Sequence, residues 1–340
     1  MSDATPEMTP GAAIDTSADA IAAAAGELAA GRLVAFPTET VYGLGARADG
    51  DAAVAQVFAA KGRPADHPLI VHVADAAAAA FFAAELPPLA ERLMAAFWPG
   101  PLTVIVPRRA GVAAAAAGGQ DTIGLRCPAH PVAQALLRAA AQAGVPGVAA
   151  PSANRFGRIS PTCAAHVRSE FGEALTILDG GDCALGIESA IVDCSRGRPV
   201  LLRPGVLTRA GIEAAAGEPL HERDAQAPRA AGTLASHYAP RARLSLVRAE
   251  ALRSALEQRP QVPQPPEGAN RLAVYSRTVS VPGDLPKRRM PDDPAAAAHE
   301  LFAVLRELDA LAVAQIWVEE PPADAAWEGV RDRLRRAAAP

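Results

Sequence analysis

Lysine and asparagine are almost absent from this sequence. It has two lysines, Lys61 and Lys287, among 33 basic residues, and two asparagines, Asn154 and Asn270. Arginine is the usual cation of this chain, so a lysine inside a short motif indicates a need for its particular side-chain geometry. Lys61 lies in a KGRP segment and Asn154 in a PSANR segment, each beside a short apolar run. A third segment, FPTETVYGLG at 36–45, places hydroxyl groups at the end of another apolar run, and the three together suggest one assembled site.

Other absences exclude several classes of protein. The four cysteines, Cys127, Cys163, Cys183 and Cys194, include no CxxC pair, so neither a zinc knuckle nor a disulfide framework is expected, and we interpret them as buried small apolar residues. No apolar run approaches the roughly 18 residues of a membrane helix. Residues 1–12 lack the basic and apolar regions of a signal peptide. We therefore expect a cytoplasmic protein with a disordered tail at 1–12 and no membrane association.

The charge balance also limits the partners. The net charge of -4 provides no general attraction for a polyanion, so tight binding of nucleic acid is not expected. With 340 residues, half of them hydrophobic, the chain is long enough for two domains of roughly 150 residues each.

Helical patterns alternate with short apolar runs through the first two thirds of the chain, which indicates an α/β fold. The expected helices span 12–30, 52–60, 88–97, 131–143 and 163–171, and the first should end at Gly31. The expected strands span 33–36, 69–73, 103–106, 148–150, 175–178, 190–193 and 200–203.

A change of composition at 217–232, where charged residues, proline and alanine dominate, indicates a linker. Beyond it we expect strands at 244–247, 271–275 and 313–318 and helices at 249–258, 294–308 and 324–337. This alternation predicts a second, smaller domain with a parallel sheet.

Lys61 and Arg63 form a pair of neighbouring cations between a helical run and Pro64. Phosphate suits such a pair, because lysine supplies a point charge and arginine a fork that holds two oxygens. The alternative is a solvated helix end, where the two charges contribute little. The scarcity of lysine favours a functional site.

His67 and His72 flank a predicted strand. A separation of five residues places them on opposite faces, so they are not expected to share a metal. Each is either structural or part of a pocket.

Ser152 precedes Asn154 at the end of another predicted strand. The segment lacks the GxSxG pattern of a nucleophilic serine, so hydrogen bonding to sugar or phosphate oxygens is the better interpretation. A simple turn remains the alternative.

Arg126 and Arg203 each end an apolar, strand-like run. A cation in this position needs a partner, and a structural carboxylate and a ligand anion fit equally well. Gly43 and Gly45 loosely match a dinucleotide-binding GxGxxG pattern, but they do not follow a strand in a tight turn, and no P-loop is present.

Taken in order, the motifs of residues 17–240 resemble those of the threonylcarbamoyl-AMP synthases, whose N-terminal unit is the YrdC-like domain. The matching segments are FPTETVYGLG, KGRPADHPLIVHV, FWPGPLTVIV, TIGLRCP, APSANRFGRISPT, LDGG, GIESAIVD, LLRPG and SHYAP. Residues 243–337, with WVEEPP and DRLRRAA, are similar to the C-terminal domain of two-domain members.

The resemblance implies an α/β architecture in two units. We expect a YrdC-like catalytic domain at 13–212, with a twisted mixed sheet and helices around a concave site. A linker at 213–241 would cross the active site, and a small Rossmann-like domain with a parallel sheet would follow at 242–338.

The same resemblance implies an enzyme that joins L-threonine, bicarbonate and ATP into threonylcarbamoyl-AMP and releases pyrophosphate. The product would pass to a threonylcarbamoyl transferase that modifies tRNA. No enzyme nucleophile is needed, because a carbamate formed on threonine attacks the α-phosphate, and positioning and charge stabilisation supply the rate. Mg²⁺ would arrive with the phosphates of ATP, and no metal site in the protein is expected.

Site residues follow from the matching motifs. Threonine would be bound by Thr40, His72, Arg126 and Ser189. ATP would be surrounded by Lys61, Arg63, His67, Thr122, Ser152, Asn154, Ser160, Arg203 and Tyr238, with Lys61 and Arg63 as the catalytic cations. The sequence departs from the family pattern at Ala190, where a threonine is usual, and at 232–234, before the SHYAP segment.

Two alternative functions remain. One is carbamoyl transfer as in hydrogenase-maturation proteins, but the zinc-binding cysteine pairs and acylphosphatase unit of those proteins are missing here. The other is a non-enzymatic RNA-binding or translation-associated module, which the acidic net charge disfavours.

Overall fold

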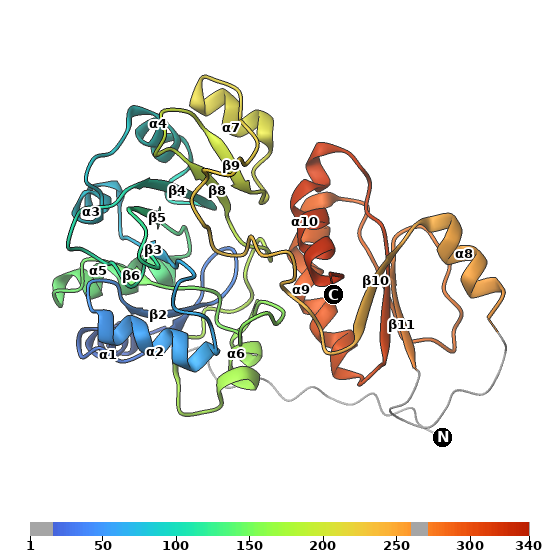
Figure 1. The fold of residues 1–340 in the computed structure, drawn as a ribbon. Helices are drawn as coiled ribbons and strands as arrows, with labels where there is room; N and C mark the ends of the chain where they lie inside the picture. The colour runs from blue at the N-terminus through green and yellow to red at the C-terminus, as the bar shows by residue number, and fades with distance from the viewer. Residues whose placement is uncertain (1–15, 260–270, 340) are drawn as a thin grey trace.

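The computed structural model describes residues 16–259 and 271–339, which form two α/β units (Figure 1). The tail expected at 1–12 lies outside the described residues. No helix within them has the length and apolar character needed to span a bilayer.

The first unit contains seven of the described helices and one large sheet. Its helices are α1 (Ala18–Ala29), α2 (Asp51–Lys61), α3 (Ala76–Phe82), α4 (Pro88–Phe97), α5 (Pro131–Gln142), α6 (Ala164–Phe171) and α7 (Arg209–Ala216). Its strands are β1 (Val34–Phe36), β2 (Gly43–Arg47), β3 (Ile70–His72), β4 (Leu102–Pro107), β5 (Thr122–Arg126), β6 (Val148–Ala149), β7 (Thr176–Ile177), β8 (Ala190–Asp193) and β9 (Val200–Arg203).

These strands form one mixed sheet in the order β7-β1-β2-β6-β3-β5-β4-β8-β9. Three pairs are parallel (β1 with β7, β3 with β5, β4 with β8) and the other five are antiparallel, which confirms the predicted mixed sheet. The first expected helix is confirmed where it is described: the Ser17 hydroxyl caps α1 by accepting from the Ala20 N–H, and Gly31 follows its end with a φ of 77°.

The GxGxxG-like segment is a strand rather than a phosphate-binding turn. Gly43 and Gly45 lie in β2, which pairs antiparallel with β1. A Cβ on Gly45 would stand 2.7 Å from Val148 and 2.9 Å from the Phe36 ring. Close packing between strands and side chains therefore explains this glycine, and the sequence prediction missed the strand because glycine is a poor strand signal.

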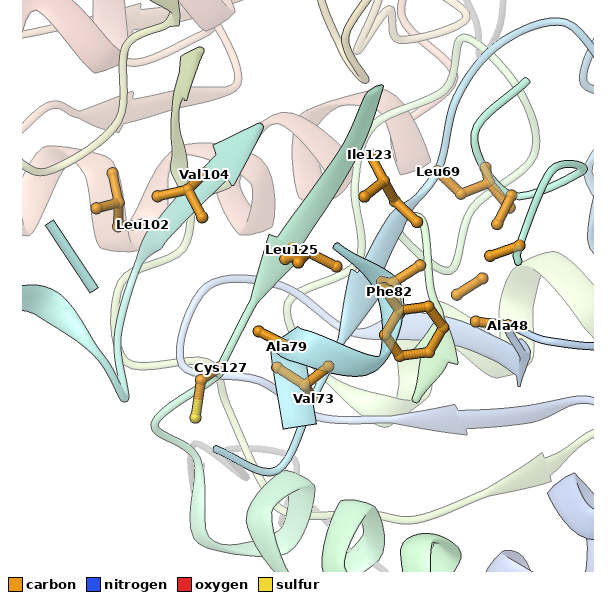
Figure 2. Close-up of a cluster of buried hydrophobic side chains, with 14 of the residues drawn as sticks. Ala48, Leu69, Val73, Ala79, Phe82, Leu102, Val104, Ile123, Leu125 and Cys127 are labelled. Atoms are coloured by element: carbon orange, nitrogen blue, oxygen red, sulfur yellow. The ribbon is translucent and has the colours of Figure 1, made fainter. Parts of the chain in front are cut away.

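The core beneath the candidate site is formed by β3, β4 and β5 with α3 against them (Figure 2). Phe82 and Ala79 of α3 are fully buried beside Leu125 and Ile123 of β5. Each large apolar side chain buried in this way contributes about 1.5–3 kcal/mol. The central strands are therefore a rigid base for the polar side chains at their ends.

The second unit confirms the predicted parallel sheet. Its elements are β10 (Arg243–Val247), α8 (Ala249–Glu257), β11 (Leu272–Ser276), β12 (Lys287–Arg289), α9 (Pro294–Ala310), β13 (Gln315–Glu319), the 3₁₀ turn η1 (Ala325–Trp327) and α10 (Glu328–Ala337). The strand order is β10-β13-β11-β12, with every pair parallel. Helices α9 and α10 lie on the side of this sheet that faces the first unit, and α8 lies on the other (Figure 1).

The two units share an apolar interface. Val41, Ile159 and Ile187 of the first unit belong to the same buried cluster as Phe302 of α9 and Tyr238 of the connecting segment. Helix α7 runs to Ala216, so the linker expected at 213–241 begins inside that helix, and the irregular chain follows from residue 217.

Candidate active site

A small cavity of about 50 Å³ lies where the central strands end and the linker passes over them. The predicted site residues that line it are Thr40, Arg63, His72, Arg126, Ser152, Ser189, Arg203 and Tyr238. Lys61, His67, Thr122, Asn154 and Ser160 do not line it. Segments far apart in sequence thus meet at one place, as expected, but five of the predicted residues stand behind or beside the cavity.

One end of the cavity is formed by the loop after β1 and the ends of β3 and β5. His72 and Arg126 are paired across these parallel strands, so both side chains face the same side of the sheet. Arg126 donates to the Thr40 hydroxyl (2.9 Å), to Glu39 Oε1 (2.6 Å) and to the Gly100 carbonyl (3.2 Å). A guanidinium has five N–H donors, so two remain for a ligand.

Glu39 is the carboxylate partner of Arg126. Both side chains are buried, and the second Glu39 oxygen accepts from the Ala129 N–H at 3.0 Å. The structural carboxylate that the sequence left open is therefore present, and it fixes the direction of the guanidinium. A buried pair of this kind costs desolvation but orients both groups.

His72 stands next to Arg126 as a neutral side chain. Burial, together with the nearby Arg126 charge, lowers the pKa of His72 to about 3. Its Nδ1 is buried and makes no hydrogen bond to any residue that the structure describes. A neutral imidazole beside a cation can exchange a hydrogen bond with a ligand without adding charge.

The opposite end contains two further arginines. Arg63 donates to the Pro68 carbonyl at 3.0 Å, while its buried Nε has no partner. Arg203 donates to the Ser189 carbonyl (3.0 Å) and hydroxyl (3.2 Å) and to the Ala231 carbonyl (3.0 Å). Burial lowers the pKa of Arg63 to about 10, which still leaves it charged at neutral pH. Two cations at one end of a cavity favour an anionic ligand.

The scarce lysine and the scarce asparagine meet directly. The Lys61 ammonium group donates to the carbonyls of Ser152 and Asn154. The Asn154 amide then donates to the carbonyls of Arg155 (2.7 Å) and Arg158 (2.9 Å). Burial, followed by the Arg63 charge, lowers the pKa of Lys61 well below its usual value. In this structure both residues brace the loop that carries Ser152, while the buried Asn154 Oδ1 makes no hydrogen bond to the residues that the structure describes.

The other predicted site residues lie around the cavity and the loop that carries Ser152. The Ser160 hydroxyl donates to Glu188 Oε1, and the His67 ring packs against Phe156 at 5.5 Å between ring centroids. Thr122 lines a second small cavity, which shares Ile70 and Ala231 with the first. The linker residue Ala231 therefore covers both cavities.

The linker occupies the cationic end of the cavity. Tyr238 is 1% exposed, adopts a φ of 64°, and its hydroxyl has no hydrogen-bond partner. A Cβ on Gly232 would stand 2.4 Å from that hydroxyl and 2.8 Å from Arg203 Nη1, so both side chains would have to shift, and the φ of 67° also favours glycine. Burial lowers the pKa of His237 to about 3.

The predictions from sequence did not include three charged residues that lie at or behind the site. Glu39 and Glu188 are carboxylates whose sequence neighbours are uncharged, and the high cost of burying an unpaired charge was a usable signal for both. Arg333 lies in a helix with several arginines, and nothing in its local sequence separates it from its neighbours.

A larger cavity of about 620 Å³ lies between α6 and α9. Two of its arginines are already paired, Arg158 with Asp309 and Arg306 with Glu170. None of the predicted site residues lines it. Across residues 16–259 and 271–339, no group of three histidine, cysteine or acidic side chains is arranged to hold a metal.

Comparison with known proteins gives a consistent assignment. A family model described as telomere recombination, for the Sua5, YciO and YrdC proteins, matches residues 27–205, and one described as the threonylcarbamoyl-AMP synthase C-terminal domain matches 207–339. The threonylcarbamoyl-AMP synthase of Pyrococcus abyssi is 38% identical over 322 residues, which is 92% of each chain, and that of Bacillus subtilis is 43% identical over 240 residues, 68% of each chain.

Solved structures agree with the sequence matches. The crystal structure of P. abyssi Sua5 complexed with L-threonine superposes with a TM-score of 0.84 at 37% identity and covers 95% of both chains. The match includes both units and the segment between them. The chain therefore belongs to the threonylcarbamoyl-AMP synthase family.

Proposed function

We propose that this protein condenses L-threonine, bicarbonate and ATP into threonylcarbamoyl-AMP and pyrophosphate. One observation carries the proposal: one cavity has a cation with free donors beside hydroxyl groups at one end, and two further cations at the other. An amino acid with a carboxylate and a nucleotide with phosphates are the ligands that this division of charge suits.

At the first end, the two free N–H groups of Arg126 would hold the carboxylate of threonine. Thr40, His72 and Ser189 would meet its remaining polar groups. His72 is neutral, so it can hydrogen-bond the amine or hydroxyl of threonine without repelling a cation. The neutral amine forms a bond to the carbon of bicarbonate, a C–O bond of bicarbonate breaks, and the departing hydroxide takes a proton from the amine and leaves as water, which gives the carbamate.

At the second end, Arg63 and Arg203 would hold the phosphates of ATP, with Ser152 beside them. A carbamate oxygen attacks the α-phosphorus, the bond to the β-phosphate oxygen breaks, and pyrophosphate leaves with the electron pair. The two arginines face the phosphate oxygens on which charge increases, which is the main source of catalysis in such transfers. Lys61 acts by bracing the loop of Ser152, as its two carbonyl contacts support.

Mg²⁺ would enter as part of the nucleotide substrate. Of the carboxylates at the site, Glu39 is held by Arg126 and Glu188 by Ser160 and Arg333. Neither has a free pair of oxygens for a resident ion, and phosphate oxygens are good ligands for Mg²⁺.

The linker must move for ATP to enter. A ligand of this size needs roughly 300–1,000 Å³, far more than the present cavity. Displacing Ala231, Gly232 and Tyr238 would free Arg203 and join the cavity to its neighbour at Thr122. The return of Tyr238 over the bound substrates would exclude water from a labile mixed anhydride. A threonylcarbamoyl transferase acting on tRNA is the proposed acceptor of the product.

The proposal is tested by measuring pyrophosphate release from MgATP with L-threonine and bicarbonate omitted in turn. Release that requires both, with threonylcarbamoyl-AMP identified by mass spectrometry, is the expected result. Release without threonine would point to another adenylating activity, and ATP binding without any release would point to a regulatory or RNA-binding role.

A further inference from the structure

Arg333 of the second unit is fully buried against the first unit. Its side chain is 0% exposed although it belongs to the surface helix α10. Its Nε donates to Glu188 Oε2 at 2.8 Å, Nη2 to the Glu188 carbonyl at 3.0 Å, and Nη1 to the Pro204 carbonyl at 2.9 Å. The guanidinium also lies over the Tyr238 ring, 5.5 Å from its centroid. Arg333 thus contacts both the first unit and the linker.

The two units approach closely enough to place this side chain accurately. A Cβ on Gly329 would stand 2.4 Å from the Gly205 carbonyl oxygen, and one on Gly186 would stand 2.1 Å from the His299 carbonyl oxygen. The chain on both sides of Glu188 and Arg203 therefore packs backbone to backbone against α9 and the start of α10. Such contacts hold the Arg333 guanidinium in place, where its Nη1 also pairs with Asp332 of the same helix at 2.8 Å.

Glu188 lies between two cations. It lines the cavity, as does Arg203, but the described residues contain no ion pair between them. One Glu188 oxygen accepts from Ser160 and the other from Arg333. Burial alone would raise the pKa of Glu188, but the charges of Arg333 and Arg203 outweigh it and keep the carboxylate ionised. Among the described residues, Arg203 meanwhile donates hydrogen bonds only to neutral oxygens of Ser189 and Ala231.

We infer that Arg333 is a positioning residue that holds Glu188 away from Arg203, so that Arg203 stays available to the phosphates of ATP. A buried carboxylate without its partner pairs with the nearest cation, because an isolated charge is costly in a low-dielectric site. Arg203 lines the same cavity as Glu188, and its pairing with Glu188 would cancel the charge offered to the nucleotide. The inference rests on the proposed function, and it gives the second unit a part in nucleotide binding.

The test is the affinity of the full-length protein for MgATP, measured by calorimetry with L-threonine present. Arg333→Met keeps much of the side-chain volume but removes the charge, and we expect it to weaken ATP binding at least tenfold. Adding Glu188→Gln to that variant removes the carboxylate that would capture Arg203. The double variant should then bind ATP within about threefold of the unmodified protein.

A matched control uses the other ion pair that joins α10 to the first unit. Arg209 of α7 pairs with Glu328 at 2.9 Å, away from the cavity. Arg209→Met should leave ATP affinity unchanged. A purely structural role for Arg333 would not predict rescue by Glu188→Gln, since that change replaces none of the hydrogen bonds that the guanidinium makes.

Several outcomes would overturn the inference. ATP affinity unchanged in Arg333→Met is one, and a double variant as weak as the single is another. If Arg333→Met does not fold, Arg333→Gln replaces it as a second variant without the charge, and a loss that Glu188→Gln does not restore, or no loss, counts against the inference. If the unmodified protein binds no ATP, the proposed function fails and the inference fails with it, whereas normal ATP binding and turnover in every variant contradicts the inference alone.

Discussion

The two ends of the cavity are built in different ways. At the threonine end, Arg126, Thr40, Glu39 and His72 all come from one unit, and the hydrogen bonds that orient Arg126 do not involve the linker. At the ATP end, Arg203 bonds to the linker, and the linker packs under Arg333 of the second unit. The first end is preorganised, while the second is assembled from three parts of the chain and must change when ATP enters.

Because of this difference, the free-energy cost of rearranging the protein for a ligand falls on the ATP end. A preformed site spends little of its binding energy on ordering, whereas a site that must displace a segment loses affinity in proportion to how stable the covered state is. Threonine specificity should therefore depend on local side chains, and ATP affinity should depend also on residues that never touch the nucleotide.

The largest effect is expected from Arg126→Ala at the preorganised end. The kcat/KM for threonine should fall by about 100-fold or more, which is the size of effect seen when one preorganised donor is removed from an active site. The protein should also lose about 3–5 kcal/mol of stability, because Glu39 is left buried without a partner. Steady-state kinetics and urea unfolding measure the two effects.

A second variant separates these two effects of Arg126→Ala. Adding Glu39→Gln should return most of the stability but not the turnover. Arg138→Ala, at an exposed site on α5, is the control and should change neither. Full activity in Arg126→Ala would contradict the assignment of the threonine end.

At the ATP end, Arg63→Ala should raise the KM for ATP by about tenfold or more, since hydrogen bonds to charged groups contribute about 1.5–3 kcal/mol. The affinity for threonine should change less than threefold, because Arg63 makes no contact with the Arg126 group. The exposed Arg155→Ala is the matched control. An equal loss of affinity for both substrates would show that the two ends are not independent.

Gly232→Ala tests whether the linker limits access. Its Cβ would clash with Tyr238 and Arg203, so the covered state should become less stable, and trypsin should cleave the linker several-fold faster without substrate. Gly217→Ala is the control, since Gly217 also has a positive φ of 76° but open space around its Cβ position. Equal cleavage rates in the two variants would mean that residues 231–238 do not hold the linker closed.

The smallest effect at neutral pH concerns the buried histidines at both ends. The pKa values of His72 and His237 lie near 3, chiefly because of burial, against about 6.5 in an unfolded chain. Between these values the unfolded chain binds more protons, so stability should fall as the pH decreases from about 6.5 towards 4 and stay constant above 7. His72→Gln should make this fall shallower in urea unfolding at a series of pH values. An unchanged slope would contradict the neutral state of His72.

Much of the framework could be predicted from local sequence. The strands at 190–193 and 200–203 and the helix at 88–97 lie where the apolar runs and their proline and glycine boundaries indicated. Strand β2 and helix α3 were missed, because glycine-rich and alanine-rich segments have no clear periodicity. Strand β12 was missed too, since its three basic residues are exposed.

The candidate site was predicted in composition but not in arrangement. The scarcity of Lys61 and Asn154 correctly marked two segments that meet, yet their contact with each other, through the Asn154 carbonyl, depends on how α2 packs beside the loop after β6. Arg126 needed a partner on physical grounds, and only the fold shows that Glu39 is that partner while two donors remain free.

The sequence by itself determined the class of fold, the family and the set of polar groups, because these depend on local periodicity and on short motifs. Tertiary structure decided which groups face the cavity and which brace it from behind. It also decided that Arg333, remote in sequence and ordinary in its helix, is buried on Glu188. The reason is physical: pairing a buried charge depends on distances between segments that only folding brings together.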